Sequence, residues 1–173
     1  MKSKIIARTG IFIALGSLLS TIVIFRMPQG GSISLCSSLF FTLPGYLFGF
    51  KMGIIAGILG GIVNFIIDPF FLHPIQFLLD YIFAFVILGI CGAYFYKSKN
   101  KNTNILLKSY VTGMFFKFIF HVLSGIVFFG SYAPKNSNIL VYSLTYNLYV
   151  LYEMIFGVLL IKLGYKFFQP FLS

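Results

Sequence analysis

The chain has 173 residues, of which 59% are hydrophobic and only 9% are charged. A soluble domain carries roughly a quarter charged residues, so this chain could not cover its surface with polar groups. The net charge of +10 would suggest nucleic acid in a soluble protein. In a membrane protein, the cytoplasmic loops are enriched in Lys and Arg, and this enrichment accounts for such an excess of positive charge. The composition therefore excludes a soluble domain and predicts an integral membrane protein that binds no nucleic acid.

Six stretches are candidates for membrane-spanning helices, for which about 20 apolar residues are needed. The second of them is short and is interrupted by Pro44 and Gly45. The segments between the stretches carry turn-forming or charged residues and leave no room for a soluble domain. We therefore expect one all-α domain over residues 1–173, a compact bundle of six transmembrane helices. The expected helices cover residues 5–25, 35–50, 53–67, 75–96, 105–129 and 139–168.

Positive charges are distributed unevenly between the two sides of this predicted bundle. With the N-terminus inside, ten Lys and Arg residues fall on the cytoplasmic side and two on the outside, and Lys117 lies within a span. By the positive-inside rule, both termini should then be cytoplasmic. The outer pair is Arg26 and Lys135; the inner residues are Lys2, Lys4, Arg8, Lys51, Lys97, Lys99, Lys101, Lys108, Lys162 and Lys166.

Small residues inside the predicted spans have helix packing as their simplest interpretation. Glycine recurs in the third span at positions that let helices approach closely in lipid. The two cysteines stand alone in apolar runs, with no spacing typical of a metal site or a disulfide framework. We expect both groups to be packing residues. They are Gly53, Gly57, Gly60, Gly61, Cys36 and Cys91.

The fifth predicted span carries polar groups where they are costly. Lys117, His121, Gly125 and Phe129 recur every four residues, so they share one helix face over roughly 18 Å. Gly125 leaves a notch between the imidazole and the aromatic ring. A lone histidine on an apolar face is usually a satisfied core residue, but a lysine one turn away favours a binding role.

Other polar residues are predicted to lie in the outer half of the same bundle. Asp80 sits in the fourth span, where an unpaired carboxylate would be costly, so it should face protein, water or ligand. Asp68 reads as a turn former before proline, and Glu153 as an internal partner for a group such as Lys117. A pocket with a carboxylate, aromatic faces and amides suits a flat organic cation. The remaining outer residues are residues 28–32, His73, Gln76, Tyr81, Tyr132, Pro134, Tyr142, Tyr146 and Asn147.

Several functions are excluded by missing motifs. The chain has no phosphate-binding loop, so it cannot grip ATP in that way. It also lacks a nucleophile elbow and a metalloprotease motif, which leaves a membrane-embedded enzyme built on Asp68, Asp80, His73 or His121 as a remote alternative. No catalytic residue, metal or cofactor is expected.

Four segments together resemble the thiamine-specific S components, the ThiT family, of energy-coupling factor (ECF) transporters. The segments are PQGGS at 28–32, HPIQFLLDY at 73–81, KFIFHVLSGIVFFGSYAP at 117–134 and YSLTYN at 142–147. The resemblance covers nearly the whole chain. It implies a six-helix protein of the bacterial plasma membrane that captures thiamine from outside. Its partners would be a transmembrane coupling subunit and two cytoplasmic ATPase subunits, besides membrane lipid.

The resemblance also implies which residues bind the vitamin. Asp80 would hydrogen-bond the aminopyrimidine or offset the thiazolium charge, and Phe129 and His121 would bracket a ring. The family has Glu at some Asp80 positions and Trp at some Phe129 positions, and this chain has no Trp. Tyr142 and Asn147 are five residues apart, so a regular helix would not direct both into one pocket. The implied set is Asp80, Tyr81, Lys117, His121, Gly125, Phe129, Tyr142 and Asn147.

A pair of small residues marks a second implied contact. Gly10 and Ala14 in the first span match the face by which S components dock on the coupling subunit, although internal packing would also explain them. Since a fold does not fix its ligand, an S component or carrier for a different small vitamin or cation remains the main alternative.

Overall fold

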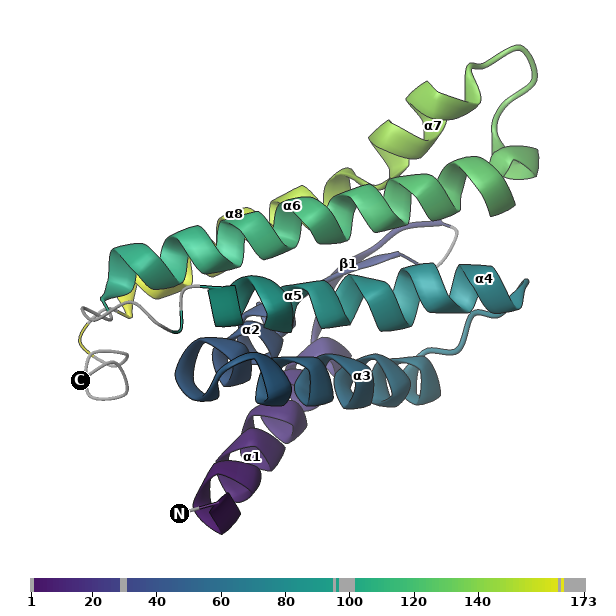
Figure 1. The fold of residues 1–173 in the computed structure, drawn as a ribbon. Coiled ribbons are helices and arrows are strands. Elements are labelled where there is room, and N and C mark those ends of the chain that lie inside the picture. Colours follow the sequence, from purple (N-terminus) through teal and green to yellow (C-terminus); the bar gives the residue numbers. More distant parts are fainter. Residues whose placement is uncertain (1, 29–30, 95, 97–101, 165, 167–173) are drawn as a thin grey trace.

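The computed structural model describes residues 2–28, 31–94, 96, 102–164 and 166, and within them the chain is a helical bundle with one small hairpin (Figure 1). The first half of the chain contains α1 (Lys2–Thr21), β1 (Val23–Arg26), β2 (Ser32–Ser34), α2 (Ser37–Phe48) and α3 (Phe50–Ile67). The second half contains α4 (Pro74–Phe77), η1 (Leu78–Phe83), α5 (Ala84–Tyr94), α6 (Thr103–Phe128), η2 (Gly130–Tyr132), α7 (Ile139–Tyr146) and α8 (Leu148–Leu163).

Within the described part of the chain, five helical segments are long and apolar enough to cross a membrane. They are Ser3–Thr21, Phe50–Ile67, Pro74–Tyr94, Thr103–Phe128 and Ile139–Leu163. The sixth expected span is α2, whose 12 residues extend only about 18 Å. Most of α2 is buried among the other helices, with Pro44 inside it. The prediction of a multi-pass membrane protein is confirmed. Helix α2, however, is shorter than the hydrocarbon core of a bilayer.

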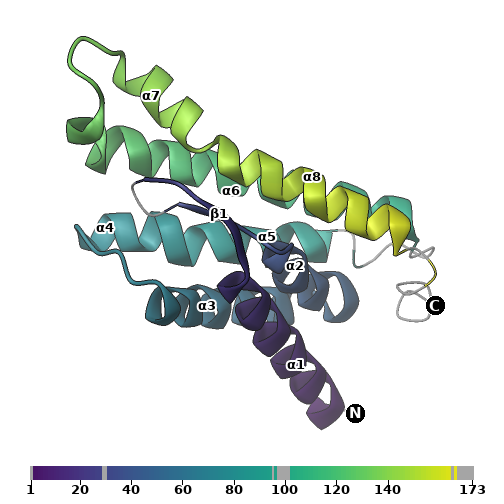
Figure 2. The ribbon, with the colours of Figure 1, turned by 180° about the vertical axis from the view of Figure 1, so that it is seen from behind.

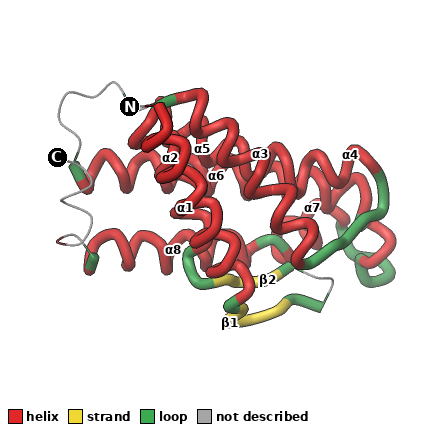
Figure 3. The backbone as a smooth tube through the Cα atoms, turned by 90° about the horizontal axis from the view of Figure 1, so that it is seen from below, coloured by secondary structure: helices red, strands yellow, loops and turns green. Residues whose placement is uncertain are grey.

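The helices are arranged so that one end of the bundle differs from the other. The start of α1 and the end of α8 lie toward one end, and α4, η2 and α7 lie at the opposite end (Figures 1 and 2). Helices α6 and α8 run side by side, and the hairpin lies beside them toward the α4 end (Figure 3). This second end is where the polar residues of the predicted pocket gather.

Glycines hold α2, α3 and α5 in close contact. A Cβ atom added to Gly53 would lie 2.5 Å from the carbonyl oxygen of Gly89, and one added to Gly45 would collide with the same oxygen. The predicted packing glycines Gly53, Gly57, Gly60 and Gly61 are all buried. The expectation of close backbone approach is therefore confirmed, and Cys36 and Cys91 are buried free cysteines as expected.

The first span ends earlier than the sequence predicts, so the expectation of helix through Phe25 was wrong. Helix α1 stops at Thr21, and β1 pairs antiparallel with β2 through Val23–Ser34, Phe25–Ile33 and Arg26–Ser32. The β-branched run from Thr21 to Ile24 favours a strand, and β2 supplies its partner. The fold is thus mainly helical with a two-stranded hairpin, not entirely α.

The last predicted helix, residues 139–168, is divided into α7 and α8 at Asn147, and its residues 165, 167 and 168 lie outside the described part. The amide of Asn147 donates to the carbonyl of Ser143 at 2.9 Å, so the side chain competes for a backbone acceptor. The break lies after both Tyr142 and Asn147, because α7 is regular through Tyr146 and the N–H of Asn147 still bonds to the carbonyl of Ser143 at 3.1 Å. Both residues nevertheless line one cavity.

The second and third helices meet at a single residue. The expected break over residues 50–53 was wrong, because α3 already begins at Phe50 and the change of direction is at Gly49. Gly49 has a φ of 89°, a conformation that glycine adopts without strain.

A further irregularity, the π-helical turn η1, lies inside the fourth span and contains Asp80 and Tyr81. Such turns occur frequently at functional sites.

Candidate functional site

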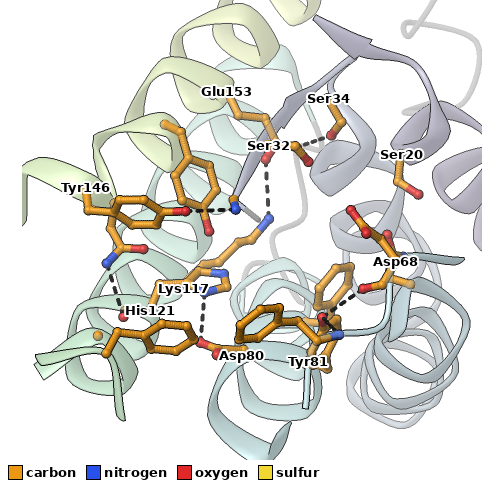
Figure 4. A pocket seen from close by; sticks show the side chains of 18 of the residues that line it. Ser20, Ser32, Ser34, Asp68, Asp80, Tyr81, Lys117, His121, Tyr146 and Glu153 are labelled. Atoms are coloured by element: carbon orange, nitrogen blue, oxygen red, sulfur yellow. Dashed lines mark hydrogen bonds and ion pairs between the residues drawn. The ribbon is translucent and has the colours of Figure 1, made fainter. Parts of the chain in front are cut away.

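A polar cavity of about 190 Å³ lies between the hairpin, α3, η1, α6, α7 and α8. All eight residues of the predicted set line it, although their binding role stays a prediction. They share the cavity with residues from the hairpin and from α8 (Figure 4). The predicted members are Asp80, Tyr81, Lys117, His121, Gly125, Phe129, Tyr142 and Asn147.

Asp80 is held by three side chains in the cavity wall. Its Oδ2 accepts from Gln76 Nε2 and from Ser124 Oγ, both at 2.8 Å. Its Oδ1 lies 3.1 Å from Nδ1 of His121 (Figure 4). A carboxylate has about four lone-pair sites, so capacity for one further donor remains. The acid and the imidazole therefore face one shared cavity.

Lys117 is paired with an acid, as the sequence suggested. Its Nζ lies 3.3 Å from Glu153 Oε2 and donates to Ser38 Oγ at 2.8 Å. The ammonium also lies 5.2 Å from the ring centroid of Phe85. An ammonium has three hydrogens, so one donor remains for the cavity. The expectation that Glu153 is an internal partner of Lys117 is confirmed.

Aromatic rings form the other walls of the cavity. Phe129 stacks on Phe70 with centroids 5.5 Å apart and an interplanar angle of 26°. Tyr146 packs edge-on against Tyr149 at 6.3 Å, and Tyr149 lies 6.0 Å from the ring of His121. Aromatic faces attract organic cations through their quadrupole. The hydroxyl of Tyr146 accepts from the backbone N–H of Gly31 at 3.1 Å, which fastens the hairpin to α7.

Tyr81 connects the cavity to the loop after α3. Its hydroxyl donates to the carbonyl of Asp68 at 2.9 Å and accepts from the N–H of Phe70 at 3.1 Å. Asp68 ends α3, in keeping with its interpretation as a turn former, and pairs with Arg26 at 3.2 Å. Tyr81 therefore positions Phe70, while its ring lines the cavity.

Four described residues expected in the outer pocket do not line the cavity: Pro28, His73, Tyr132 and Pro134. His73 caps α4 by accepting from the N–H of Ile75 at 3.1 Å, and its ring stacks on Phe128 at 5.3 Å. Tyr132 packs against Phe129 at 5.9 Å. Gln29 and Gly30 of the expected polar loop lie outside the described residues. The sequence places these residues at the correct end of the bundle. It does not distinguish residues that line the cavity from residues that pack behind its wall.

The sequence also left several lining residues unidentified. This group includes Phe70, Asn64, Tyr149 and Ser34 of the hairpin. Tyr149 looks like one apolar residue among many in its span. The serine run at residues 34, 37 and 38 was a usable signal, because serines that open a buried span need partners there.

Gly125 is predicted to be intolerant of any side chain. A Cβ atom there would collide with Ser143 Oγ and lie 3.2 Å from Nδ2 of Asn147. We expect Gly125→Ala to cost about 1–3 kcal/mol of stability and to weaken ligand binding, because overpacking displaces Asn147. Thermal unfolding in detergent and ligand titration measure both effects.

Two variants control for that substitution. Gly10→Ala introduces the same methyl group where nothing lies within 4 Å, so stability and binding should be retained. Adding Ser143→Gly to Gly125→Ala removes the colliding atoms and should restore part of the loss. Equal behaviour of Gly125→Ala and Gly10→Ala would contradict the steric explanation.

Gly10 and Ala14 face outward from α1. Both are exposed, and Gly10 has no neighbour that an added Cβ would meet. Internal packing therefore does not explain Gly10, and the pair is available to another protein or to lipid.

Membrane-length helices around an aromatic-lined cavity with polar groups define a multi-pass membrane protein with a candidate site for a small molecule. The sequence model of a family described as Thiamine transporter protein (Thia_YuaJ) matches residues 6–171. The chain belongs to this family.

Individual relatives agree with the family assignment. The Thiamine transporter ThiT of Bacillus subtilis (strain 168) is 40% identical over 130 residues, which cover 70% of this chain and 67% of the relative. The Thiamine transporter ThiT of Lacticaseibacillus paracasei (strain ATCC 334) is 37% identical over 84 residues, or 44% of this chain and 42% of that protein. A solved structure of ThiT from Listeria monocytogenes superposes with a TM-score of 0.77 at 24% identity, covering 96% of this chain and 98% of that one, and so supports the fold.

Proposed function

We propose that this protein binds thiamine in the cavity and acts as the substrate-capturing S component of an energy-coupling factor transporter. Family membership supports the ligand, since the matched relatives carry thiamine transport in their names. The observation that carries the proposal is the charge arrangement of the cavity. Among the described residues, two of the three lining acids pair with Arg26 and Lys117, and only Asp80 has no Lys or Arg in ion-pair distance.

Thiamine combines a cationic thiazolium ring with a neutral aminopyrimidine, and the cavity has a counterpart for each. The carboxylate of Asp80 suits the cation or the exocyclic amine. The rings of Phe129, Tyr146 and Tyr149 offer faces for stacking. The remaining donor of Lys117 suits a ring nitrogen of the neutral half.

The delivery step belongs to partner proteins in this proposal. The chain has no phosphate-binding loop, so ATP hydrolysis would occur in two cytoplasmic ATPase subunits joined through a transmembrane coupling subunit. The excess of cytoplasmic Lys and Arg favours cytoplasmic termini and a cavity that opens to the outside. Gly10 and Ala14 form the proposed docking face.

The ligand is tested by mass spectrometry of small molecules that co-purify with the protein, followed by calorimetry with thiamine. We expect thiamine to co-purify and to bind at one site per chain. Tight binding of a different vitamin with no thiamine binding would support the alternative S component. Fluorescence titrations must rely on Tyr, since the chain has no Trp.

A membrane-embedded enzyme has less support. The family is one of transporters, a non-enzymatic role. Within the described residues, no group of three or more His, Cys, Asp or Glu could hold a metal ion. Turnover of thiamine by the purified protein would reverse this assignment.

A further inference from the structure

Glu153 is a buried acid that binds no ligand in the proposed site, yet it has an unusually complete set of partners. Its side chain is 2% exposed. Its Oε1 lies 3.2 Å from Ser37 Oγ, 3.2 Å from the N–H of Ser38 and 3.4 Å from Ser34 Oγ. The hydroxyls of Ser34 and Ser37 also lie 2.8 Å apart, and each has one hydrogen, so the N–H of Ser38 and one of the two hydroxyls donate to this oxygen.

The backbone of the junction is bent to form this arrangement. Cys36, between the donors, has a φ of 54°, in the left-handed region that few residues other than glycine occupy. The junction thus accepts local strain, and the strained turn brings polar groups of residues 34, 37 and 38 to the carboxylate. This geometry holds Glu153 in place independently of Lys117.

The other oxygen of Glu153 faces Lys117, at 3.3 Å from its Nζ. Lys117 is only 7% exposed, so its positive charge is poorly screened by water. A buried positive charge in a site for a cationic ligand would oppose binding. The paired acid cancels that charge while leaving the ammonium able to donate a hydrogen bond.

The charges that line the cavity can be counted directly. Asp68 is paired with Arg26 and Glu153 with Lys117, so Asp80 is the one lining acid among the described residues whose charge no Lys or Arg offsets. One such charge matches one monocation. Removing the carboxylate of Glu153 alone would bring the net charge to zero.

We propose that Glu153 determines the preference of this site for a cationic over a neutral ligand, by compensating the charge of Lys117. This inference rests on the proposed thiamine site and adds a specificity-determining residue to it. Glu153 acts through Lys117 and is a positioning and charge-compensating residue, not a ligand contact.

The test compares thiamine with a neutral isostere in which carbon replaces the thiazolium nitrogen. The two ligands have the same shape, so the ratio of the neutral Kd to the thiamine Kd reports the preference for the cation. Calorimetry on the purified full chain measures this ratio for the wild type, Glu153→Gln, Lys117→Met and the double variant. The local charge is zero in Glu153→Gln, minus two in Lys117→Met and minus one in the double variant.

We expect the ratio to fall about tenfold in Glu153→Gln and to rise about tenfold in Lys117→Met, a change of about 1.4 kcal/mol in either direction. The double variant should return close to the wild-type ratio, even though both of its Kd values are weaker. Glu153→Asp keeps the charge and should keep the ratio. If Glu153→Gln does not fold, Lys117→Met against the double variant carries the same tenfold comparison.

A structural role alone gives a different pattern. Glu153→Gln would then weaken both ligands equally and leave the ratio unchanged, or the ratio would fall and stay low in the double variant; either result overturns the inference. A wild-type protein that binds neither ligand would instead overturn the proposed thiamine site. Ser37→Ala removes one donor to Glu153 without changing any charge, and a tenfold fall of the ratio in that variant would also contradict charge compensation.

Discussion

Replacing Asp80 with Asn is expected to weaken thiamine binding by about a hundredfold, equal to about 2.8 kcal/mol. The substitution removes the one lining carboxylate that has no Lys or Arg partner among the described residues. It also introduces an amide group that could donate where Gln76 and Ser124 already donate. Truncating one side of a buried charged contact typically costs this much or more. Calorimetry on the purified variant measures the loss.

Asp68→Asn is the matched control for that result. Asp68 also lines the cavity, but its side chain is 50% exposed and it pairs with Arg26. Exposed ion pairs contribute little, so thiamine affinity should change by less than about fivefold. His121→Ala, which removes the ring contacting Asp80 Oδ1, should fall between the two. Unchanged binding in both Asp80→Asn and His121→Ala would remove the proposed site.

The site was largely predictable from the sequence because helix periodicity fixes which residues share a face. Lys117, His121 and Gly125 follow one another at intervals of four on α6, and all three line the cavity. Phe129, the next in the series, terminates α6 and still faces the cavity. Polar residues in apolar spans are expensive, so their positions identified the interior.

The hairpin could not be predicted in the same way. Residues 22–25 continue the apolar run of α1, and a short apolar run does not distinguish strand from helix. The strand forms because residues 32–34 pair with it. This pairing is a contact with a separate segment, and the local sequence of residues 22–25 does not reveal it. The same limit applies to the acid–serine cluster. Glu153 and Ser38 are 115 residues apart, and no local pattern joins them.

The break at Asn147 is a feature of the last span that apolar content does not predict. Apolar content alone predicts an uninterrupted helix from residue 139 onward, whereas α7 and α8 are separate helices. The side-chain amide of Asn147 instead donates to Ser143 and, at 3.3 Å, to the carbonyl of His121. The second of these bonds ties the break to α6, so a tertiary contact contributes to the irregularity.

Gly10→Trp is expected to abolish thiamine uptake in cells while leaving thiamine binding by the purified protein unchanged. Gly10 is exposed on α1, and a Cβ atom added there meets no described atom of this protein within 4 Å. The cavity is lined from Ser20 onward, so a bulky group at residue 10 does not reach it. A small residue followed by another after four positions allows close helix crossing, which an indole ring would prevent.

Leu15→Trp separates loss of docking from general damage to the helix. Leu15 is 39% exposed and lies about 140° around α1 from Gly10, so an indole ring there occupies a different face. Uptake should persist in Leu15→Trp and fail in Gly10→Trp, at equal expression and equal affinity for thiamine. Binding and uptake are measured separately, so the two outcomes can be told apart. A Gly10→Trp protein that still supports uptake would contradict docking through this face. A Gly10→Trp protein that loses thiamine binding would show that α1 supports the cavity.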